Sequence, residues 1–304
     1  MEFGRVSVNE LEGIDFTLPA DPAFNKKVLK GKAVKKPEVY VGCAKWGRKE
    51  WLGSLYPLKT KEKDFLDNYV NHYNSIELNA THYKLYDTAA IQKWSDKAGK
   101  KNFLFCPKMY KGVTHFGSLK GKEPMTTEFL RGILAFEEHL GPVFIQVSES
   151  FAPKRKEELF DYLESLPKDV QFFMEVRQPE WFANEAITEE LFSKLKELNI
   201  GAVITDTSGR RDCAHMYLTV PKTFIRYVGN SLHETDFTRI DEWVHRIKYW
   251  LDNGLKEVYF FMHMHDEALS PQLSEYLVNN LNKVCGLDLP VPLFQKQPSQ
   301  GNLL

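Results

Sequence analysis

Eight short apolar runs, each leading through a polar loop into a segment of helical period, constrain the fold of this chain more than any other feature. Each run is rich in β-branched or aromatic residues and nearly continuously apolar, as expected of strands buried on both faces. The runs are 38–42, 75–78, 103–107, 143–147, 172–176, 202–205, 224–228 and 258–262. Strict alternation of strand and helix favours a parallel α/β sheet. Eight such units predict closure into a single (β/α)8 barrel of the TIM type.

The segments between the runs support this alternation. The clearest helical stripe lies within 240–251, and only the segment 208–215 is too short and polar to predict a helix. A doubly wound open sheet is the structural alternative. That fold would need a phosphate-binding loop after the first strand, and the stretch from Gly42 to Gly47 lacks the GxGxxG pattern.

The domain boundaries follow from the same pattern. We expect an irregular N-terminal arm over 1–37, the barrel over 38–286, and a C-terminal tail over 287–304 that is rich in Pro, Gln and Asn. The arm carries six lysines between Lys26 and Lys36, and such charge runs are usually solvated, so it is expected to pack loosely on the barrel.

Composition excludes several classes of protein. Hydrophobic residues make up 43% of the 304, which is enough for a folded core. The formal net charge of -1 argues against a surface that binds nucleic acid everywhere. Four widely spaced cysteines predict neither a disulfide framework nor a zinc ribbon. The absence of a long apolar span or an apolar leader predicts a cytoplasmic protein with no membrane partner.

Polar side chains gather where the predicted strands end. Because the carboxyl ends of parallel barrel strands converge, we expect these residues to share one mouth. They are Trp46, Glu77, Asn79, Lys108, Tyr110, Gln146, Glu175, Arg177, Asp206, Arg226, His263, His265 and Asp266. An ion-pair network that merely plugs the barrel is the alternative interpretation.

Three chemistries fit this inventory. Glu77, Glu175 and Asp206 are candidates for acid and base roles, as in sugar hydrolysis. His263, His265 and Asp266 are candidate ligands for a divalent metal that activates water, although surface histidines explain them equally. A desolvated Lys108 is a candidate for Schiff-base formation.

The runs VGCAKWGRKEWLGSLYP, IELNATHYKL, PKMYKGVTH, LGPVFIQVSESF and MEVRQPEW, followed by VITDTSG and FIRYVGN, resemble the YecE-like family, the domain of unknown function numbered seventy-two. The resemblance covers about Glu38 to Leu281 and implies a TIM-type barrel with no established reaction. It adds Tyr83, Thr114 and His115 to the polar mouth. Two positions depart from the family pattern. The family usually has Arg-x-His-Gly on the seventh strand, whereas this chain has Arg226-Tyr227-Val228-Gly229. After the eighth strand the family usually has a pair of asparagines, whereas this chain has His263-Met264-His265-Asp266.

The leading functional hypothesis is an enzyme, a hydrolase or lyase, acting on a small anionic or sugar-like substrate. In it Glu77 and Glu175 serve as acid and base, Arg177, Arg226 and Lys108 bind the anion, and His115 carries protons. A metal-dependent phosphoesterase or nuclease is the second hypothesis. The third is a non-catalytic barrel that binds a ligand or nucleic acid through aromatic rings and basic segments, including the lysines of 26–36 and Arg210 and Arg211.

Overall fold

The computed structural model describes residues 2–295, and all eight predicted runs form strands within that range. The strands are β1 (Glu38–Cys43), β2 (Ser75–Leu78), β3 (Leu104–Pro107), β4 (Val143–Gln146), β5 (Phe172–Glu175), β6 (Gly201–Asp206), β7 (Lys222–Gly229) and β8 (Glu257–Met264). The last strand extends beyond its predicted end, so His263 lies inside β8 rather than after it.

Helices follow the strands as the alternating pattern predicts. The α-helices are α1 (Val8–Leu11), α2 (Phe65–Tyr69), α3 (Ala80–Tyr83), α4 (Thr88–Ala98), α5 (Lys111–Thr114), α6 (Glu123–Ile133), α7 (Lys156–Glu164), α8 (Glu185–Glu197), α9 (Glu234–Asp252) and α10 (Ser270–Cys285). The 3-10 helices are η1 (Ala23–Lys27), η2 (Lys49–Trp51), η3 (Glu62–Asp64), η4 (Leu134–His139), η5 (Pro153–Arg155), η6 (Pro179–Trp181), η7 (Arg211–Cys213) and η8 (Glu267–Leu269). Only η7 follows β6, as expected from the polar segment there. Within residues 2–295 no helix is both long enough and apolar enough to cross a membrane.

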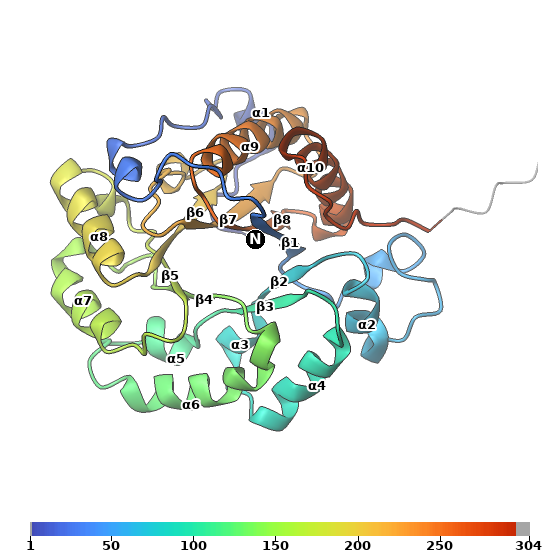
Figure 1. Cartoon of the computed structure of the whole chain (residues 1–304), viewed down its shortest axis with the longest axis horizontal. Helices are drawn as coiled ribbons and strands as arrows, with labels where there is room; N and C mark the ends of the chain where they lie inside the picture. The colour runs from blue at the N-terminus through green and yellow to red at the C-terminus, as the bar shows by residue number, and fades with distance from the viewer. Residues whose placement is uncertain (1, 296–304) are drawn as a thin grey trace, which may run out of the picture.

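The expected closed eight-stranded barrel is wrong. Six strands form one parallel sheet in the order β1-β8-β7-β6-β5-β4, and β2 pairs only with β3 in a separate two-stranded sheet. The six-stranded sheet curls around the centre of the molecule, with the helices outside it (Figure 1). Between β3 and β4 there is no ladder: one isolated bridge joins Phe105 of β3 to Leu140, which precedes β4, and another joins Lys108, which follows β3, to Phe144 of β4. The fold is therefore an open, curled α/β sheet.

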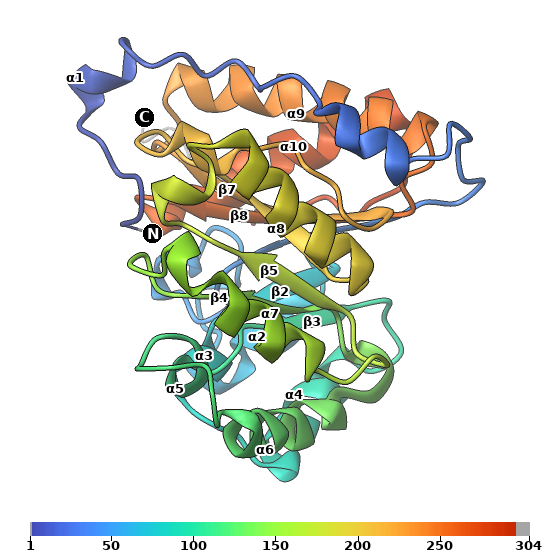
Figure 2. The same cartoon turned by 90° about the vertical axis from the view of Figure 1, so that its left-hand side faces the viewer.

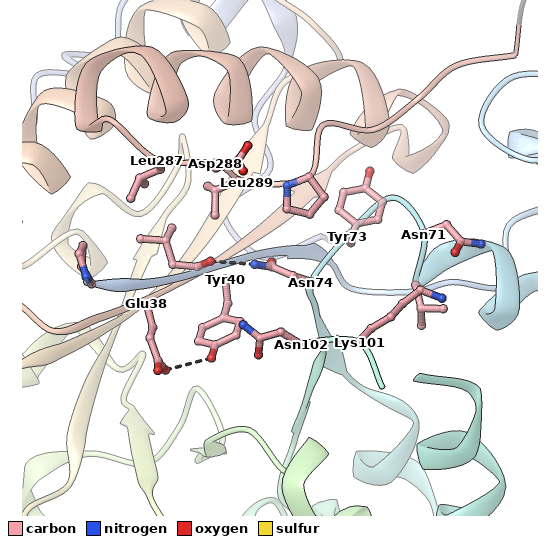
Figure 3. A pocket seen from close by; sticks show the side chains of 14 residues that line it. Glu38, Tyr40, Asn71, Tyr73, Asn74, Lys101, Asn102, Leu287, Asp288 and Leu289 are labelled. Carbon is pink, nitrogen blue, oxygen red and sulfur yellow. Dashed lines mark hydrogen bonds between the residues drawn. The ribbon is translucent and has the colours of Figure 1, made fainter. Parts of the chain in front are cut away.

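The physical reason for the opening between β1 and β2 is that side chains take the hydrogen bonds a neighbouring strand would supply. The Asn74 amide accepts from the Val41 backbone N–H at 2.7 Å and donates to the Val39 carbonyl at 2.8 Å. Figure 3 shows Asn74 beside β1 in this bridging position. One side chain thus occupies both ladder positions of this part of β1.

The Tyr69 hydroxyl bridges the same seam one step further along. It accepts from the Cys43 N–H at 2.7 Å and donates to the Ser75 carbonyl at 3.0 Å. Gly42 lies between these contacts, and a Cβ atom there would come within 2.0 Å of the Ser75 carbonyl oxygen. The two strands are therefore close but joined by side chains. The periodicity of the strands does not show that side chains replace backbone hydrogen bonds here.

The interior of the curled sheet is filled by side chains that alternate along the strands. Apolar groups form the lower layer: Tyr40, Cys106, Phe144, Phe173, Val203, Phe224, Tyr259 and Phe261. Because side chains of a strand alternate between its faces, the residue two positions further along points the same way. Those positions hold the polar layer at the carboxyl ends: Lys108, Gln146, Glu175, Thr205, Arg226 and His263. Sequence period alone thus places a polar layer above an apolar one.

The N-terminal arm packs more closely than expected. Its six lysines are exposed, but Leu11, Leu18 and Phe24 are buried against the rest of the chain. The Asp21 carboxylate accepts from Arg246 and from the Trp250 indole of α9, each at 2.7 Å. Figure 2 shows the segment running past α1 and along α9. The predicted tail is described as far as Gln295, and its remainder, 296–304, lies outside the described residues.

Candidate functional site

A cavity of about 640 Å³ lies at the carboxyl ends of the strands, where open α/β sheets bind their ligands. We call it the carboxyl-end pocket. Eight of the residues predicted from the sequence line it: Asn79, Tyr83, Lys108, His115, Gln146, Arg177, Arg226 and His263. Sequence reasoning missed Glu2, Ala44, Lys45, His82, Lys111, Phe116 and Glu267, which also line it. Most of the missed residues lie on loops, where period carries no signal.

The Arg226 guanidinium forms the centre of the pocket floor. Its Nε and Nη2 donate to the two oxygens of Glu77, each at 2.8 Å, and its Nη1 donates to Glu175 Oε2 at 2.9 Å. Three of its five N–H donors are therefore used, and two remain for other acceptors. The side chain is only 1% exposed. Burial of such a cation is tolerable because both glutamates pair with it.

Glu77 and Glu175 lie behind the pocket wall and are fully engaged. Glu77 also accepts from Asn79 Nδ2 at 2.8 Å and from His263 Nε2 at 3.0 Å. Glu175 Oε1 accepts from Arg177 Nε at 2.6 Å and from Thr205 Oγ1 at 2.8 Å. These contacts pair each carboxylate with an arginine and at least one further donor.

The protonation of both carboxylates is fixed by these partners. Burial raises the pKa of Glu77 and of Glu175, but the neighbouring cations outweigh it. Arg226 and His263 hold the pKa of Glu77 well below its usual range, and Arg177 and Arg226 lower the pKa of Glu175 to about 2. A carboxyl group with so low a pKa is ionised near neutral pH and is a poor proton donor. The geometry therefore favours these glutamates as anchors for arginine rather than as acid and base.

Lys108 is the most perturbed cation in the pocket. Burial, reinforced by the nearby Arg226 charge, lowers the pKa of its ammonium group to about 7. Its Nζ donates to Gln146 Oε1 at 2.8 Å and lies 5.7 Å from the centroid of the Phe144 ring. A lysine with this pKa is largely in the free-amine form just above neutral pH, where it is a nucleophile and a base.

Two histidines stand beside Lys108 on the pocket wall. Burial and the Lys108 charge lower the pKa of His82 to about 3 and that of His115 to about 4. The rings lie 4.8 Å apart, and His115 Nδ1 is 2.8 Å from Thr114 Oγ1. His82 Nδ1 donates to the Met109 carbonyl at 2.8 Å. Both imidazoles are therefore neutral near pH 7, where each can donate one hydrogen bond and accept another.

The N-terminal segment reaches into the pocket. The Phe3 ring lies 3.9 Å from the Arg177 guanidinium carbon and 5.3 Å from that of Arg210. The Thr207 hydroxyl donates to the Phe3 carbonyl at 3.1 Å, and this holds the segment against the end of β6. Figure 2 shows the start of the chain next to the strands of the sheet. Nothing in the arm sequence marks Phe3 as part of a site.

Asp206 does not belong to the pocket, although its place at a strand end predicted it there. It follows Thr205 by one position and so points to the opposite face of the strand. There its carboxylate accepts from the Trp243 indole at 2.7 Å and pairs with Arg239 at 2.9 Å and with Arg211. This buried cluster holds α9 against the sheet. Asp206 is thus a structural residue in this fold.

The three candidate metal ligands do not converge. His263 bonds to Glu77, and Asp266 Oδ1 accepts from the Ala268 N–H as the cap of η8. His265 lies two residues beyond His263 and does not line the pocket. Among residues 2–295 no three His, Cys, Asp or Glu side chains are grouped as a metal site. His263 lies within β8, which ends at Met264, whereas His265 and Asp266 lie in the turn that follows it.

The remaining predicted residues lie around the pocket rather than in it. Trp46 lines an adjoining groove and packs edge-on against Trp94, with ring centroids 5.3 Å apart. Thr114 is buried and contacts the pocket only through His115. Tyr110 is half-buried at the start of α5 and does not line the cavity.

A second cavity, of about 570 Å³, lies at the amino ends of β1 and β3 (Figure 3). Its lining includes Glu38, Asn74 and Lys101, and Glu38 accepts a hydrogen bond from Tyr40 at 3.0 Å. The lysine-rich part of the arm lies toward this same end, because Gly31 N–H donates to the Asn253 carbonyl where α9 ends. The basic arm and the carboxyl-end pocket are therefore at opposite ends of the strands.

A family model described as "Protein of unknown function DUF72" matches residues 40–296. The chain belongs to the DUF72 family. This confirms the resemblance drawn from the strand-end motifs. UPF0759 protein YecE of Escherichia coli K12 is 25% identical to this DUF72 chain over 281 residues, covering 86% of the chain and 99% of YecE. UPF0759 protein YunF of Bacillus subtilis is 31% identical over 90 residues, which is 30% of each protein.

Solved DUF72 structures share the fold. A DUF72 protein of Enterococcus faecalis superposes with a TM-score of 0.64 at 17% identity, covering 84% of this chain and all of that one. A Thermotoga maritima DUF72 protein gives a TM-score of 0.57 at 21% identity, covering 81% and 97% of the two chains. The names of these relatives assign no reaction, so the chemistry has to be argued from the pocket.

Proposed function

We propose that this DUF72 protein is an enzyme of lyase or hydrolase type that binds a small anionic carbonyl compound in the carboxyl-end pocket. The observation that carries the proposal is the buried Lys108, whose pKa is lowered to about 7 beside Arg226. Perturbed lysines of this kind are the ones that attack carbonyl carbons. The pocket volume falls within the range of about 300–1,000 Å³ that is common for small-molecule sites.

The residues divide into binding and reacting groups. The remaining N–H donors of Arg226, with Arg177 and Lys111 on the wall, suit a carboxylate or phosphate. The free amine of Lys108 attacks the carbonyl carbon, and the resulting carbinolamine loses water to give an iminium ion. The dehydration takes up one proton from solvent, because the pKa of His115 is lowered to about 4 and its imidazole is rarely protonated near pH 7. Gln146 orients the amine through its carbonyl oxygen.

Reductive trapping tests this proposal. The protein is incubated with glyoxylate and cyanoborohydride at pH values below and above about 7, and labelled lysines are mapped by mass spectrometry. Lys108 is expected to label before the exposed Lys154, with a rate that rises through the lowered pKa. Inorganic phosphate should protect Lys108 but not Lys154. Equal labelling of the two lysines at every pH would contradict the proposal.

A non-catalytic anion-binding protein is the second candidate. It is favoured by one observation: both buried glutamates are paired with arginine, which lowers their pKa values and makes them weak bases. In that case phosphate protects Lys108 as before, but no small aldehyde forms an adduct there. The trapping experiment therefore separates the two candidates.

A further inference from the structure

An aromatic groove of about 380 Å³ adjoins the carboxyl-end pocket. It is lined by Ala44, Lys45, Trp46, Gly47, Ile76, Leu78, Asn79, Ala80 and Tyr83. Four of these residues, Ala44, Lys45, Asn79 and Tyr83, also line the carboxyl-end pocket. The two cavities therefore adjoin at these four residues.

The two adjoining cavities differ in the side chains that line them. The pocket side carries Lys108, Arg177 and Arg226, whereas the groove side carries one indole, one phenol ring and aliphatic side chains. Tyr83 stands at the boundary, 66% exposed, with the Lys111 ammonium 5.4 Å from its ring centroid. The exposed ring is therefore accessible to a ligand, and the cation beside it favours an anionic one.

We infer that the aromatic groove is a subsite for a planar aromatic ring carried by the same small molecule whose anionic group sits in the carboxyl-end pocket. The substrate class of the proposed enzyme is then an aromatic or heteroaromatic anion, and Trp46 and Tyr83 are its specificity residues. This inference rests on the proposed anion-binding role of the pocket. It assigns a function to Trp46, which the Lys108 chemistry does not use.

The geometry around Trp46 supports this role. Its ring packs edge-on against Trp94, and Trp94 in turn contacts Tyr86 at a centroid distance of 4.8 Å. The Trp46 carbonyl accepts from the buried Tyr56 hydroxyl at 2.9 Å. The indole is thus fixed from behind while still lining the groove. A prepositioned ring loses little conformational freedom when a ligand stacks on it.

Calorimetric titration with methyl phosphate and phenyl phosphate tests the inference, because both carry the same anion and only one carries a ring. Phenyl phosphate is expected to bind roughly tenfold more tightly, the gain typical of one aromatic contact. In Trp46→Leu, which keeps apolar volume without the ring, this preference should fall to about twofold or less. Methyl phosphate affinity should stay unchanged in that variant.

The matched control is Tyr249→Leu, because Tyr249 is an exposed aromatic residue on α9 that lines neither the groove nor the carboxyl-end pocket. It should keep the preference for phenyl phosphate, and circular dichroism should show that both variants are folded. Equal affinities of the two phosphates in the wild type, or an undiminished preference in Trp46→Leu, would overturn the subsite. Failure of the Lys108 trapping alone would overturn the proposed reaction and leave the subsite standing. If neither phosphate binds, both are overturned.

Discussion

Glu175 illustrates at the scale of one residue how a site is built from compensating charges. It is 2% exposed, and Arg177, Arg226 and Thr205 donate to it. The carboxylate is stable in the interior only because these donors replace water. Its role is therefore to hold two arginines at the wall of the pocket. Glu77 likewise holds the Arg226 guanidinium in place through a buried ion pair.

Acid should remove the stabilising contribution of Glu175. Its pKa in the folded chain, about 2, is below the ordinary 4.5. The unfolded chain therefore binds the proton first as the pH falls. The contribution is fully present above about pH 4.5 and is lost toward pH 2, a change of about 3 kcal/mol. The measurement is the free energy of unfolding of wild type and Glu175→Gln in denaturant across this range.

The difference between the two proteins should be about 3–5 kcal/mol near neutral pH, because the substitution leaves buried arginines uncompensated. It should shrink as the pH falls. Glu62→Gln is the control, since Glu62 pairs with Lys49 at an exposed site and should cost at most about 1 kcal/mol. A difference for Glu175→Gln that does not change with pH would contradict the assignment.

Much of the site is predictable from the sequence by the two-residue period of strands. Glu175, Arg226 and His263 each follow an interior aromatic residue by two positions and face the interior of the sheet, where Arg226 and His263 line the pocket. The same rule excludes Asp206 from the set of interior-facing residues, because it follows Thr205 by one position, and includes Thr205 instead. His82 and Lys111 lie in the four-residue helices α3 and α5, which are too short to show a helical period, so only the folded chain reveals them.

At the scale of elements, the seam between β1 and β2 depends on the Asn74 side chain. Asn74→Ala removes the acceptor of the Val41 amide and the donor to the Val39 carbonyl. Each group left without its partner costs about 1–3 kcal/mol unless water reaches it. We expect Val41 to exchange its amide hydrogen faster in the variant, measured by nuclear magnetic resonance.

Asn71→Ala provides the comparison, because the exposed Asn71 amide donates only to the Asp67 carbonyl within the preceding turn. It should leave Val41 exchange unchanged. Equal exchange of Val41 in Asn74→Ala and wild type would show that the side-chain bridge is dispensable.

The sequence predicts the elements well and their closure poorly, for a physical reason. Apolar runs identify all eight strands because burial on both faces dictates their composition. Whether neighbouring strands form a ladder depends on which backbone groups meet. At this seam the amide of Asn74 and the hydroxyl of Tyr69 occupy those positions from outside the strand pair. The number of predicted strands therefore suggests a closed barrel, although the sheet is open between β1 and β2.

At the scale of the whole molecule, the N-terminal segment and the pocket form one unit. Phe3 lies on the Arg177 guanidinium, so it competes with any anion for the same cation. Phe3→Ala should tighten methyl phosphate binding about twofold to fivefold, in line with the loss of one cation–π contact. Calorimetry measures this directly. Val8→Ala, on the exposed part of the same segment, should have no effect, and unchanged binding in Phe3→Ala would refute the competition.

The position of Glu2 on the pocket wall has a practical consequence for the biochemistry of this protein. A purification tag joined ahead of this residue would begin beside the binding cavity. A polyhistidine tag there would bring imidazoles and bound nickel into a space built for small anions. Ligand screens and crystallisation trials should therefore use protein whose tag has been cleaved, and a difference between tagged and cleaved samples would itself report on the pocket.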